Sequence, residues 1–281
     1  MNYFFGTGAG MRRSVQAAIV ALGCALAPTM PAQAEHTLAM AAPVNPNEQL
    51  VFGQMRISRW LAETVVRAAE VTGVEPSLLM AMADKESSFN PSIRASTSSA
   101  EGLFQFLDGT WIEVLKRYGA KHGYAAAAEV IRPVKGRLSV AEADRTWILS
   151  LRRDPYLSAL MAGEMIRSTQ DTLVAGKAER TVSGTDIYLA HFLGVNGASR
   201  FLDLMDDAPE KAAPSAFPKA AKANRTLFFG TKTAEKGKAK SGPKTLAEVH
   251  QLLAQVMDKR VARYENAGRD LGTRQFASAS E

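Results

Sequence analysis

Apolar residues recur at helical spacing through the central part of the chain. From residue 58 to residue 206, hydrophobic positions return every three or four residues in one segment after another, which is the period of an amphipathic helix. Glycine, proline and asparagine separate these segments, and several begin after the serine, threonine or aspartate residues that commonly cap helices. The pattern predicts an all-α globular domain of several helices over residues 58–206, with at most a small hairpin in a loop.

The expected helices have moderate lengths. They cover residues 59–71, 76–87, 108–119, 125–130, 139–148, 156–175, 185–193 and 198–205. Residues 35–57 and 207–245 lack clear helical spacing, so we interpret both as linkers, the second one basic and rich in alanine, lysine and proline. Thr245 then caps an amphipathic helix over residues 246–268, and residues 269–281 are expected to be a disordered tail.

Residues 1–34 have the three parts of a secretory signal peptide. Two arginines at positions 12 and 13 supply a positive start, residues 15–27 form a short apolar run, and residues 32–34 provide a small-residue cleavage site. We therefore predict that this segment is removed and that the protein is periplasmic. Cys24 is the only cysteine, and the Ala-Leu-Gly before it resembles a degenerate lipobox, so a lipid-anchored lipoprotein is the alternative.

The charge balance is mildly basic and decides little by itself. The chain has a formal net charge of +6, and removal of the two arginines in residues 1–34 leaves +4. Such a protein is attracted to any anionic polymer, including a cell wall. The four histidines lack the paired spacing of a zinc site, and the sequence has no phosphate-binding loop or serine nucleophile motif. We therefore expect no metal, no cofactor and no nucleic-acid partner.

One glutamate lies on the apolar face of an expected helix. With about 100° per residue, Glu86 falls within about 20° of Leu79 and close to Met82, whereas Asp84 and Lys85 point to the opposite, polar side. Glutamate is rarely buried, and the end of a helix disfavours negative charge. Both effects favour the neutral carboxyl group, the form that a general acid needs. The alternative is a frayed helix end that turns Glu86 to water.

A second glutamate meets the same criterion. On the helix expected over residues 156–175, Leu157, Leu160 and Met161 define an apolar face, and Glu164 falls on it. Periodicity therefore nominates two glutamates and does not choose between them.

The residues that follow Glu86 distinguish the two glutamates. Glu86 and Ser87 form a pair at the helix end, followed by a loop of serine, threonine and alanine at residues 96–100 and by Gly-Leu-Phe-Gln-Phe at residues 102–106. This order and spacing resemble the soluble lytic transglycosylases, relatives of goose-type lysozyme. Their signature is a Glu-Ser pair, a Ser/Ala-rich loop and a Gly-Leu-(Met/Phe)-Gln-(Ile/Phe) segment.

A third block matches the family in part. Many members carry Ala-Tyr-Asn-x-Gly at the position of residues 190–194. Ala190 and Gly194 match this pattern, whereas His191 and Phe192 stand in place of tyrosine and asparagine. The resemblance covers residues 58–206 and implies a lysozyme-like, α-rich fold for them.

The resemblance also implies a chemistry. Glu86 would be the sole catalytic carboxylate, protonating the glycosidic oxygen between N-acetylmuramic acid (MurNAc) and N-acetylglucosamine (GlcNAc) of peptidoglycan. It would then take the proton of the muramyl C6 hydroxyl, which attacks the anomeric carbon and leaves a 1,6-anhydro end. No water, metal or cofactor would take part. Ser87 would position the N-acetyl group of the sugar, and His191 would touch Glu86 or the substrate. The residues at the glycan groove would be Ser87, Gly102, Gln105, Phe106, Tyr188 and His191.

Two other functions are compatible with the sequence. A hydrolytic lysozyme cleaves the same bond with water and usually needs a second carboxylate, for which Asp108, Glu101 and Glu164 are candidates. A non-catalytic peptidoglycan-binding or scaffold protein is the other, because the third block departs from the family pattern. The helix over residues 246–268 is a candidate docking surface for a cell-envelope protein or for the catalytic domain itself.

Overall fold

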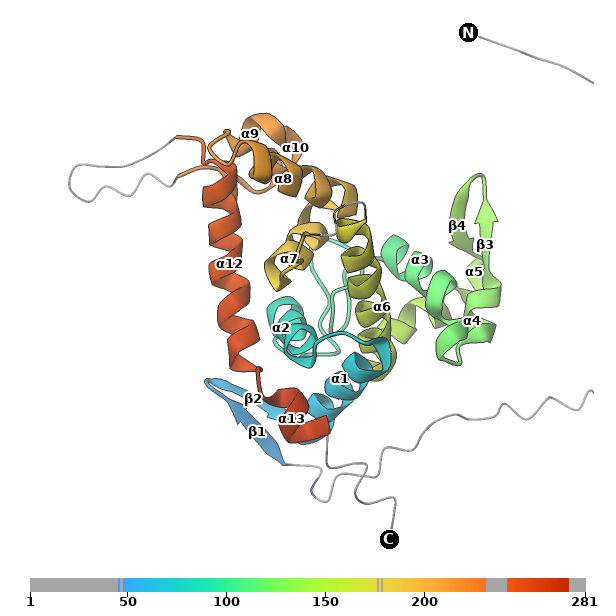
Figure 1. Cartoon of the computed structure of the whole chain (residues 1–281). Coiled ribbons are helices and arrows are strands. Elements are labelled where there is room, and N and C mark those ends of the chain that lie inside the picture. The colour runs from blue at the N-terminus through green and yellow to red at the C-terminus, as the bar shows by residue number, and fades with distance from the viewer. Residues whose placement is uncertain (1–44, 46–47, 176, 178, 231–241, 273–281) are drawn as a thin grey trace, which may run out of the picture. The chain divides into compact units, whose positions relative to one another are not determined.

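Helices form most of the residues that the computed structural model of this chain describes, namely residues 45, 48–175, 177, 179–230 and 242–272 (Figure 1). Within these residues, two antiparallel strand pairs accompany the helices. They are β1 (Gln49–Phe52) with β2 (Met55–Ser58), and β3 (Ile131–Val134) with β4 (Arg137–Val140). The α-rich fold class predicted from the sequence is confirmed. The expected signal peptide at residues 1–34 lies outside the described residues.

The helices begin near the caps that the sequence indicates. Ser58 Oγ accepts the N–H of Leu61, and the Asp154 carboxylate accepts the N–H of Leu157. No helix of the described residues has both the length and the apolar composition that a membrane span requires. The helices are α1 (Arg59–Thr72), α2 (Pro76–Ser87), α3 (Asp108–Tyr118), α4 (Ala125–Val130), α5 (Glu142–Ser150), α6 (Pro155–Val174), α7 (Gly184–Leu193), α8 (Val195–Asp207), α9 (Ala213–Ala216), α10 (Pro218–Ala223), α11 (Arg225–Phe228), α12 (Leu246–Arg263) and α13 (Ala267–Gly272), with 3-10 turns η1 (Ala120–His122) and η2 (Leu151–Arg153).

The linker predicted over residues 35–57 is wrong for its last part, because residues 49–58 form the β1–β2 hairpin. Its turn places Gly53 at φ +60°, a left-handed conformation that glycine adopts without strain. Ile57 is buried, and the Phe52 ring packs 5.3 Å from the Tyr264 ring. Each strand has four residues, too few for alternating hydrophobicity to be recognised in the sequence.

The linker predicted over residues 207–245 is wrong for residues 213–228, which form α9, α10 and α11. Phe217 and Phe228 are buried there together with three alanines. Alanine loses no side-chain entropy on burial, so a segment whose composition is typical of a linker still packs. The tail expected over residues 269–281 likewise begins inside α13, and residues 231–241 and 273–281 lie outside the described part of the chain.

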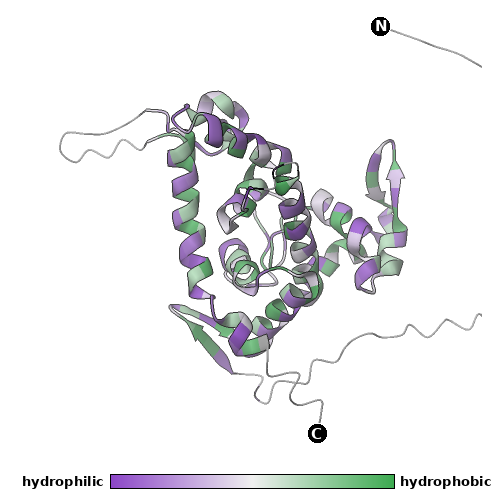
Figure 2. Ribbon diagram, in the orientation of Figure 1, coloured by the Kyte–Doolittle hydropathy of each residue, from purple (hydrophilic) through white to green (hydrophobic). Residues whose placement is uncertain are grey.

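Two hydrophobic clusters hold the helices together, and α12 contributes to both. The first cluster lies among α1, α2, α3 and α6, and the second lies among α7, α8 and the helices α9–α11. Figure 2 shows hydrophilic and hydrophobic residues alternating along α12, as expected for a helix with one packed side. Its buried residues are Leu246, Val249 and Leu253 in the second cluster and Met257 in the first. The packed unit therefore extends beyond residue 206 and includes the C-terminal helix.

A buried carboxylate on α2 fixes the end of α12. Asp84 is 5% exposed, and its Oδ2 accepts hydrogen bonds from Arg263 Nη1 at 2.5 Å and from the Tyr264 hydroxyl at 3.0 Å. Burial, with the nearby charge of Asp84, raises the pKa of Tyr264, so this hydroxyl stays protonated and donates. The expectation that Asp84 lies on a polar, solvent-facing side of α2 is wrong, because α12 covers that side.

Glu164 belongs to a second buried ion cluster. Its side chain is 0% exposed, and its Oε1 accepts a hydrogen bond from Lys121 Nζ at 2.5 Å and lies 2.8 Å from His122 Nε2. Arg167 lies 3.4 Å from the other carboxylate oxygen. Burial by itself raises the pKa of Glu164, but the hydrogen bonds with Lys121 and His122 outweigh it, so the pKa lies below its ordinary value. The cluster therefore holds Glu164 as a carboxylate in the interior.

Replacement of Asp84 by alanine should destabilise the fold, because Arg263 and Tyr264 lose their buried acceptor. Breaking a buried charge pair costs about 3–5 kcal/mol. Since Arg263 is 19% exposed, we expect the lower end, about 3 kcal/mol or roughly 6–12 °C in melting temperature. The control Glu70→Ala removes an exposed carboxylate from α1 and should change stability by less than about 0.5 kcal/mol. Equal melting temperatures of Asp84→Ala and Glu70→Ala, measured by circular dichroism, would refute this role of Asp84.

Stability should also fall in acid because of Glu164. Its pKa is lower in the folded protein than the ordinary value of about 4.3. The ionised Glu164 side chain therefore stabilises the folded state at pH values above about 4.3. This stabilisation is lost as the pH falls below that value and through the lower pKa of Glu164 in the folded protein. Glu164→Gln should be less stable than the wild type at pH 7 and should lose less stability between pH 7 and about pH 3. Urea unfolding at both pH values measures this, and an unchanged acid dependence in the variant would contradict it.

Candidate active site

A groove of about 710 Å³ lies where the C-terminal end of α2 meets the loop before α3, the middle of α6 and the end of α7. Lys85 and Glu86 contribute from α2, and Gln105 and Leu107 contribute from the loop. Met165 and Thr169 of α6 form a further part of its wall, and Ala190 and His191 of α7 complete it. The groove therefore gathers segments from more than a hundred positions of the sequence around the last turn of α2.

Glu86 is the carboxylate that the last turn of α2 places in this groove. Its side chain is 13% exposed, and its Oε1 lies 3.6 Å from His191 Nε2. The prediction that Glu86 lies on a largely buried face agrees with this low exposure. No arginine or lysine of the described residues forms an ion pair with it, in contrast to the interior carboxylates Asp84 and Glu164. Glu86 is thus enclosed by the groove, and among the described residues the His191 imidazole is the one group that forms an ion pair with it.

The backbone after Glu86 turns sharply through left-handed conformations. Ser88 has φ 50° and Phe89 has φ 62°, which cost non-glycine residues about 1–2 kcal/mol each. The N–H groups of Ser88 and Phe89 donate to the carbonyls of Asp84 and Ala83 and so close the helix end. Phe89 is buried, and its ring lies 5.7 Å from the Tyr264 ring. Packing against the end of α12 therefore supports the turn that positions Glu86.

Ser87 joins the helix end to the groove loop. It is 6% exposed, and its hydroxyl donates to the Leu103 carbonyl at 2.8 Å and approaches the Ala83 carbonyl at 3.2 Å. Its side chain is not part of the groove lining. The hydroxyl thus turns inward and bonds to the loop backbone, and the expected role of Ser87 at the sugar stays a prediction.

Arg152 holds the loop from inside. This residue of η2 is 2% exposed and donates to the carbonyls of Ser99 at 2.6 Å and Phe106 at 3.0 Å. It also donates to the Leu149 carbonyl at 3.0 Å and to the carboxylates of Glu101 and Asp108, both at 2.9 Å. The loop is thereby tied to one buried guanidinium. Glu101 and Asp108 are accordingly partners of Arg152 and are not part of the groove lining.

Gly102 is required where the loop passes Arg152. It has φ +86°, and a Cβ atom there would lie 2.2 Å from the Arg152 carbonyl oxygen. A larger residue would therefore displace the backbone of η2. Gly102 is not among the residues that line the groove, and its expected role at the glycan stays a prediction.

Gln105 and Phe106 border the groove as expected. Gln105 has a left-handed φ of 51°, and its side-chain nitrogen donates to the carbonyls of Ile93 at 3.1 Å and Gly102 at 2.9 Å. Phe106 is 3% exposed, and its ring meets Trp111 edge-on at 5.3 Å. The amide nitrogen of Gln105 is thus engaged within the loop, which leaves its oxygen as the atom suited to accept a hydrogen bond from a ligand.

His191 and Tyr188 come from α7 with different roles. His191 lines the groove, and its side chain is 34% exposed. The Tyr188 ring stacks on the imidazole, with centroids 6.1 Å apart and 9° between planes, and the Lys85 ammonium lies 5.3 Å from the Tyr188 centroid. Tyr188 does not line the groove and stacks on His191, and its expected contact with the substrate stays a prediction.

Sequence reasoning missed a second carboxylate at the groove. Glu113, an exposed residue of α3, is part of the lining, whereas the proposed second carboxylates Asp108, Glu101 and Glu164 are not. Glu113 gives no local signal, because an exposed glutamate opposite the apolar face of a helix is the usual arrangement. No group of three or more histidine, cysteine, aspartate or glutamate side chains in the described residues is placed to hold a metal ion.

A known family model matches the part of the chain that contains Glu86. Residues 63–134 match the family model of the transglycosylase SLT domain. The matched stretch runs from α1 to β3 and contains Glu86, Ser87 and the segment from Gly102 to Phe106, whereas α7 and α12 lie outside it. The α-rich architecture agrees with a lysozyme-like domain of this type. The chain therefore carries a transglycosylase SLT domain over residues 63–134, and this domain indicates peptidoglycan cleavage of the lytic transglycosylase type at the level of the domain family.

Proposed function

We propose that the groove around Glu86 is the catalytic centre of a lytic transglycosylase that cleaves the β-1,4 bond between MurNAc and GlcNAc and leaves 1,6-anhydroMurNAc ends. The family match supports peptidoglycan cleavage of this general type. One observation carries the finer assignment. Among the buried or nearly buried carboxylates discussed above, Glu86 alone opens into the groove, while Asp84, Glu101 and Glu164 are paired with cations in the interior.

In the proposed reaction, Glu86 serves first as acid and then as base. Its carboxyl proton moves to the glycosidic oxygen as the bond to the muramyl C1 breaks, which frees the O4 hydroxyl of GlcNAc. The resulting carboxylate takes the proton of the C6 hydroxyl on the same muramyl residue, and O6 bonds to C1. Glu86 ends the cycle protonated, as it began. No water is consumed, so the reaction needs no second carboxylate to take a proton from water.

His191 supports this double role from 3.6 Å. When Glu86 has given up its proton, an imidazole N–H beside Oε1 is placed to stabilise the carboxylate by a short movement of either side chain. The Tyr188 ring is stacked on the His191 imidazole and limits the positions that the imidazole can occupy. His191 thus acts as a positioning residue in the place where many family members carry tyrosine.

A hydrolytic muramidase is the second candidate, because Glu113 lines the same groove. In that reaction a second carboxylate either activates water or forms a covalent intermediate, depending on its separation from the acid. Glu113 is therefore the residue whose removal separates the two reactions.

We also propose that the enzyme acts on glycan strands in the periplasm. This rests on the signal-like sequence of residues 1–34, which the described structure does not include.

Three matched amide variants test the assignment by the release of soluble fragments from purified peptidoglycan. Glu86→Gln keeps the size of the side chain but cannot donate the proton, and activity should fall by about 10²–10⁴-fold. Glu113→Gln should retain activity within about threefold, as should Glu164→Gln when it is assayed well below its melting temperature. A comparable loss in Glu113→Gln would favour the hydrolytic reaction. Near-normal activity in Glu86→Gln would refute Glu86 as the acid.

A further inference from the structure

A second hollow lies beside the catalytic groove. It has a volume of about 510 Å³ and is formed by the end of α7, by α8 and by α9 and α10. Phe192, Leu193 and Phe217 provide apolar walls, and Arg200 and Lys219 are the charged residues of its lining. Within the described residues, no carboxylate lines this hollow.

The last turn of α7 separates this hollow from the groove. Ala190 and His191 line the catalytic groove, and the next two residues, Phe192 and Leu193, line the hollow. A helix with its side chains is about 10–12 Å across, so the two sites are about one helix width apart. A ligand bound at Glu86 with a substituent of about 10 Å can therefore reach the hollow.

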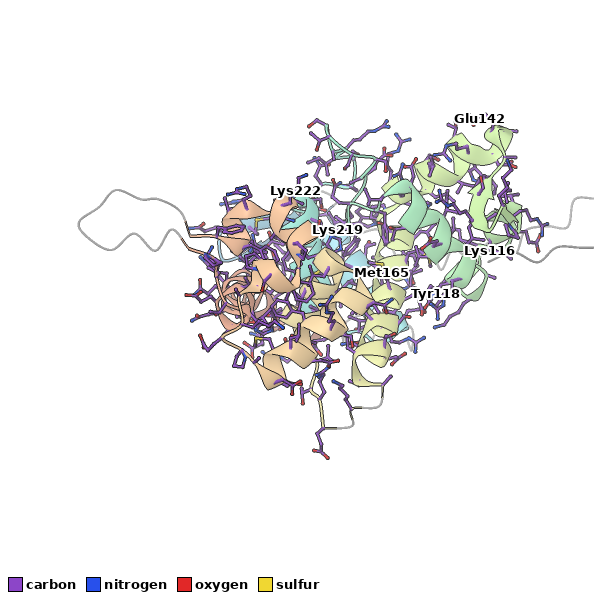
Figure 3. The ribbon with its side chains drawn as sticks, turned by 90° about the horizontal axis from the view of Figure 1, so that it is seen from above. Lys116, Tyr118, Glu142, Met165, Lys219 and Lys222 are labelled. Atoms are coloured by element: carbon purple, nitrogen blue, oxygen red, sulfur yellow. The ribbon has the colours of Figure 1, made fainter. Side chains whose placement is uncertain are left out.

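No carboxylate of the described residues pairs with the two cations of the hollow. The Arg200 guanidinium lies over the Phe217 ring, 5.5 Å from its centroid, and neither Arg200 nor Lys219 forms an ion pair with a described residue. Figure 3 shows Lys219 and Lys222 on α10, seen from above. Met165, which belongs to the wall of the catalytic groove, is labelled in the same view. By contrast, Arg152 and Arg180 each bind two carboxylates. The lining of the hollow thus combines apolar walls with two cations that form no ion pair with the described residues.

We propose that this hollow binds the carboxylate-bearing stem peptide of the muramyl residue whose bond is cleaved at Glu86. This inference rests on the proposed function. The stem peptide begins on the reacting sugar, carries free carboxylates and has short apolar alanyl side chains. An extended peptide advances about 3.3 Å per residue, so three residues span the width of the α7 turn. Arg200 and Lys219 pair with the carboxylates, and Phe192 and Phe217 contact the alanyl methyl groups.

The proposed contact changes substrate preference and leaves the chemical step unchanged. The stem peptide is bound equally in the ground state and the transition state, because the bonds that change lie in the sugar. Such an interaction lowers KM and leaves kcat unaltered. The enzyme should therefore prefer glycan strands that carry peptides over strands of equal length from which an amidase has removed them.

The test compares these two strand preparations with the full-length protein. The Arg200→Ala/Lys219→Ala double variant should have a KM about tenfold higher than the wild type for peptide-bearing strands. Its kinetics on peptide-free strands should equal those of the wild type. Lys259→Ala, which removes an exposed lysine from α12, is the matched control and should behave as the wild type. Equal KM values of the wild type for both strands would overturn the proposal. So would an equal loss of the double variant on both strands, because the hollow would then bind glycan.

A binding measurement separates this proposal from the proposed function. In a Glu86→Gln background, the dissociation constant for peptide-bearing strands should be lower than that for peptide-free strands, and the Arg200→Ala/Lys219→Ala changes should abolish the difference. This result is expected whether or not the wild type cleaves either preparation. If the wild type cleaves neither preparation but the binding preference is present, only the catalytic assignment is refuted. If the binding preference is missing, the hollow is not the peptide site.

Discussion

The buried contact of Asp84 with Arg263 and Tyr264 is the constraint on which the arrangement of the site depends. Asp84 stands two residues before Glu86 on a helix that is packed on most of its surface. Its partners anchor the end of α12 across α2, and the Tyr264 ring then packs against Phe89 in the strained turn that follows Glu86. A buried ion pair adds little net stability, but losing one partner is expensive, so the contact specifies geometry more than it strengthens the fold.

Burial by itself does not distinguish Glu86 from the other enclosed carboxylates of this protein. Asp84, Glu101 and Glu164 are all at least as buried as Glu86, yet each is bound to arginine or lysine and held in its charged form or in a fixed place. Glu86 differs because it opens into a groove and faces one imidazole. The loop opposite it is rigid for a separate reason, since Arg152 binds both its backbone and its carboxylates. The site therefore sets one groove carboxylate, paired with no arginine or lysine of the described residues, against a loop that is held by hydrogen bonds to the buried Arg152.

Local patterns explain what could be predicted from the sequence. Helical periodicity and caps gave most helices between residues 58 and 206, and the Glu-Ser pair with the Gly-Leu-Phe-Gln-Phe segment selected Glu86 and Gln105. The burial of Asp84 was missed because its partners lie about 180 positions away, and the ion cluster that distinguishes Glu164 comes from another segment. A motif does not show the direction of a hydroxyl or the approach of Arg152, so the inward hydrogen bond of Ser87 and the close packing of Gly102 could not be predicted. Short strands and alanine-rich helices lacked a pattern long enough to recognise.

The source of the oxygen at the new chain end tests the central claim most directly. Purified peptidoglycan is cleaved in water enriched in oxygen-18, and the new muramyl ends are analysed by mass spectrometry. If Glu86 activates the muramyl C6 hydroxyl, the ends contain no label and are lighter by one water than a reducing end. Muramyl ends that retain the mass of that water and carry oxygen-18 at C1 from the first turnovers would contradict the account.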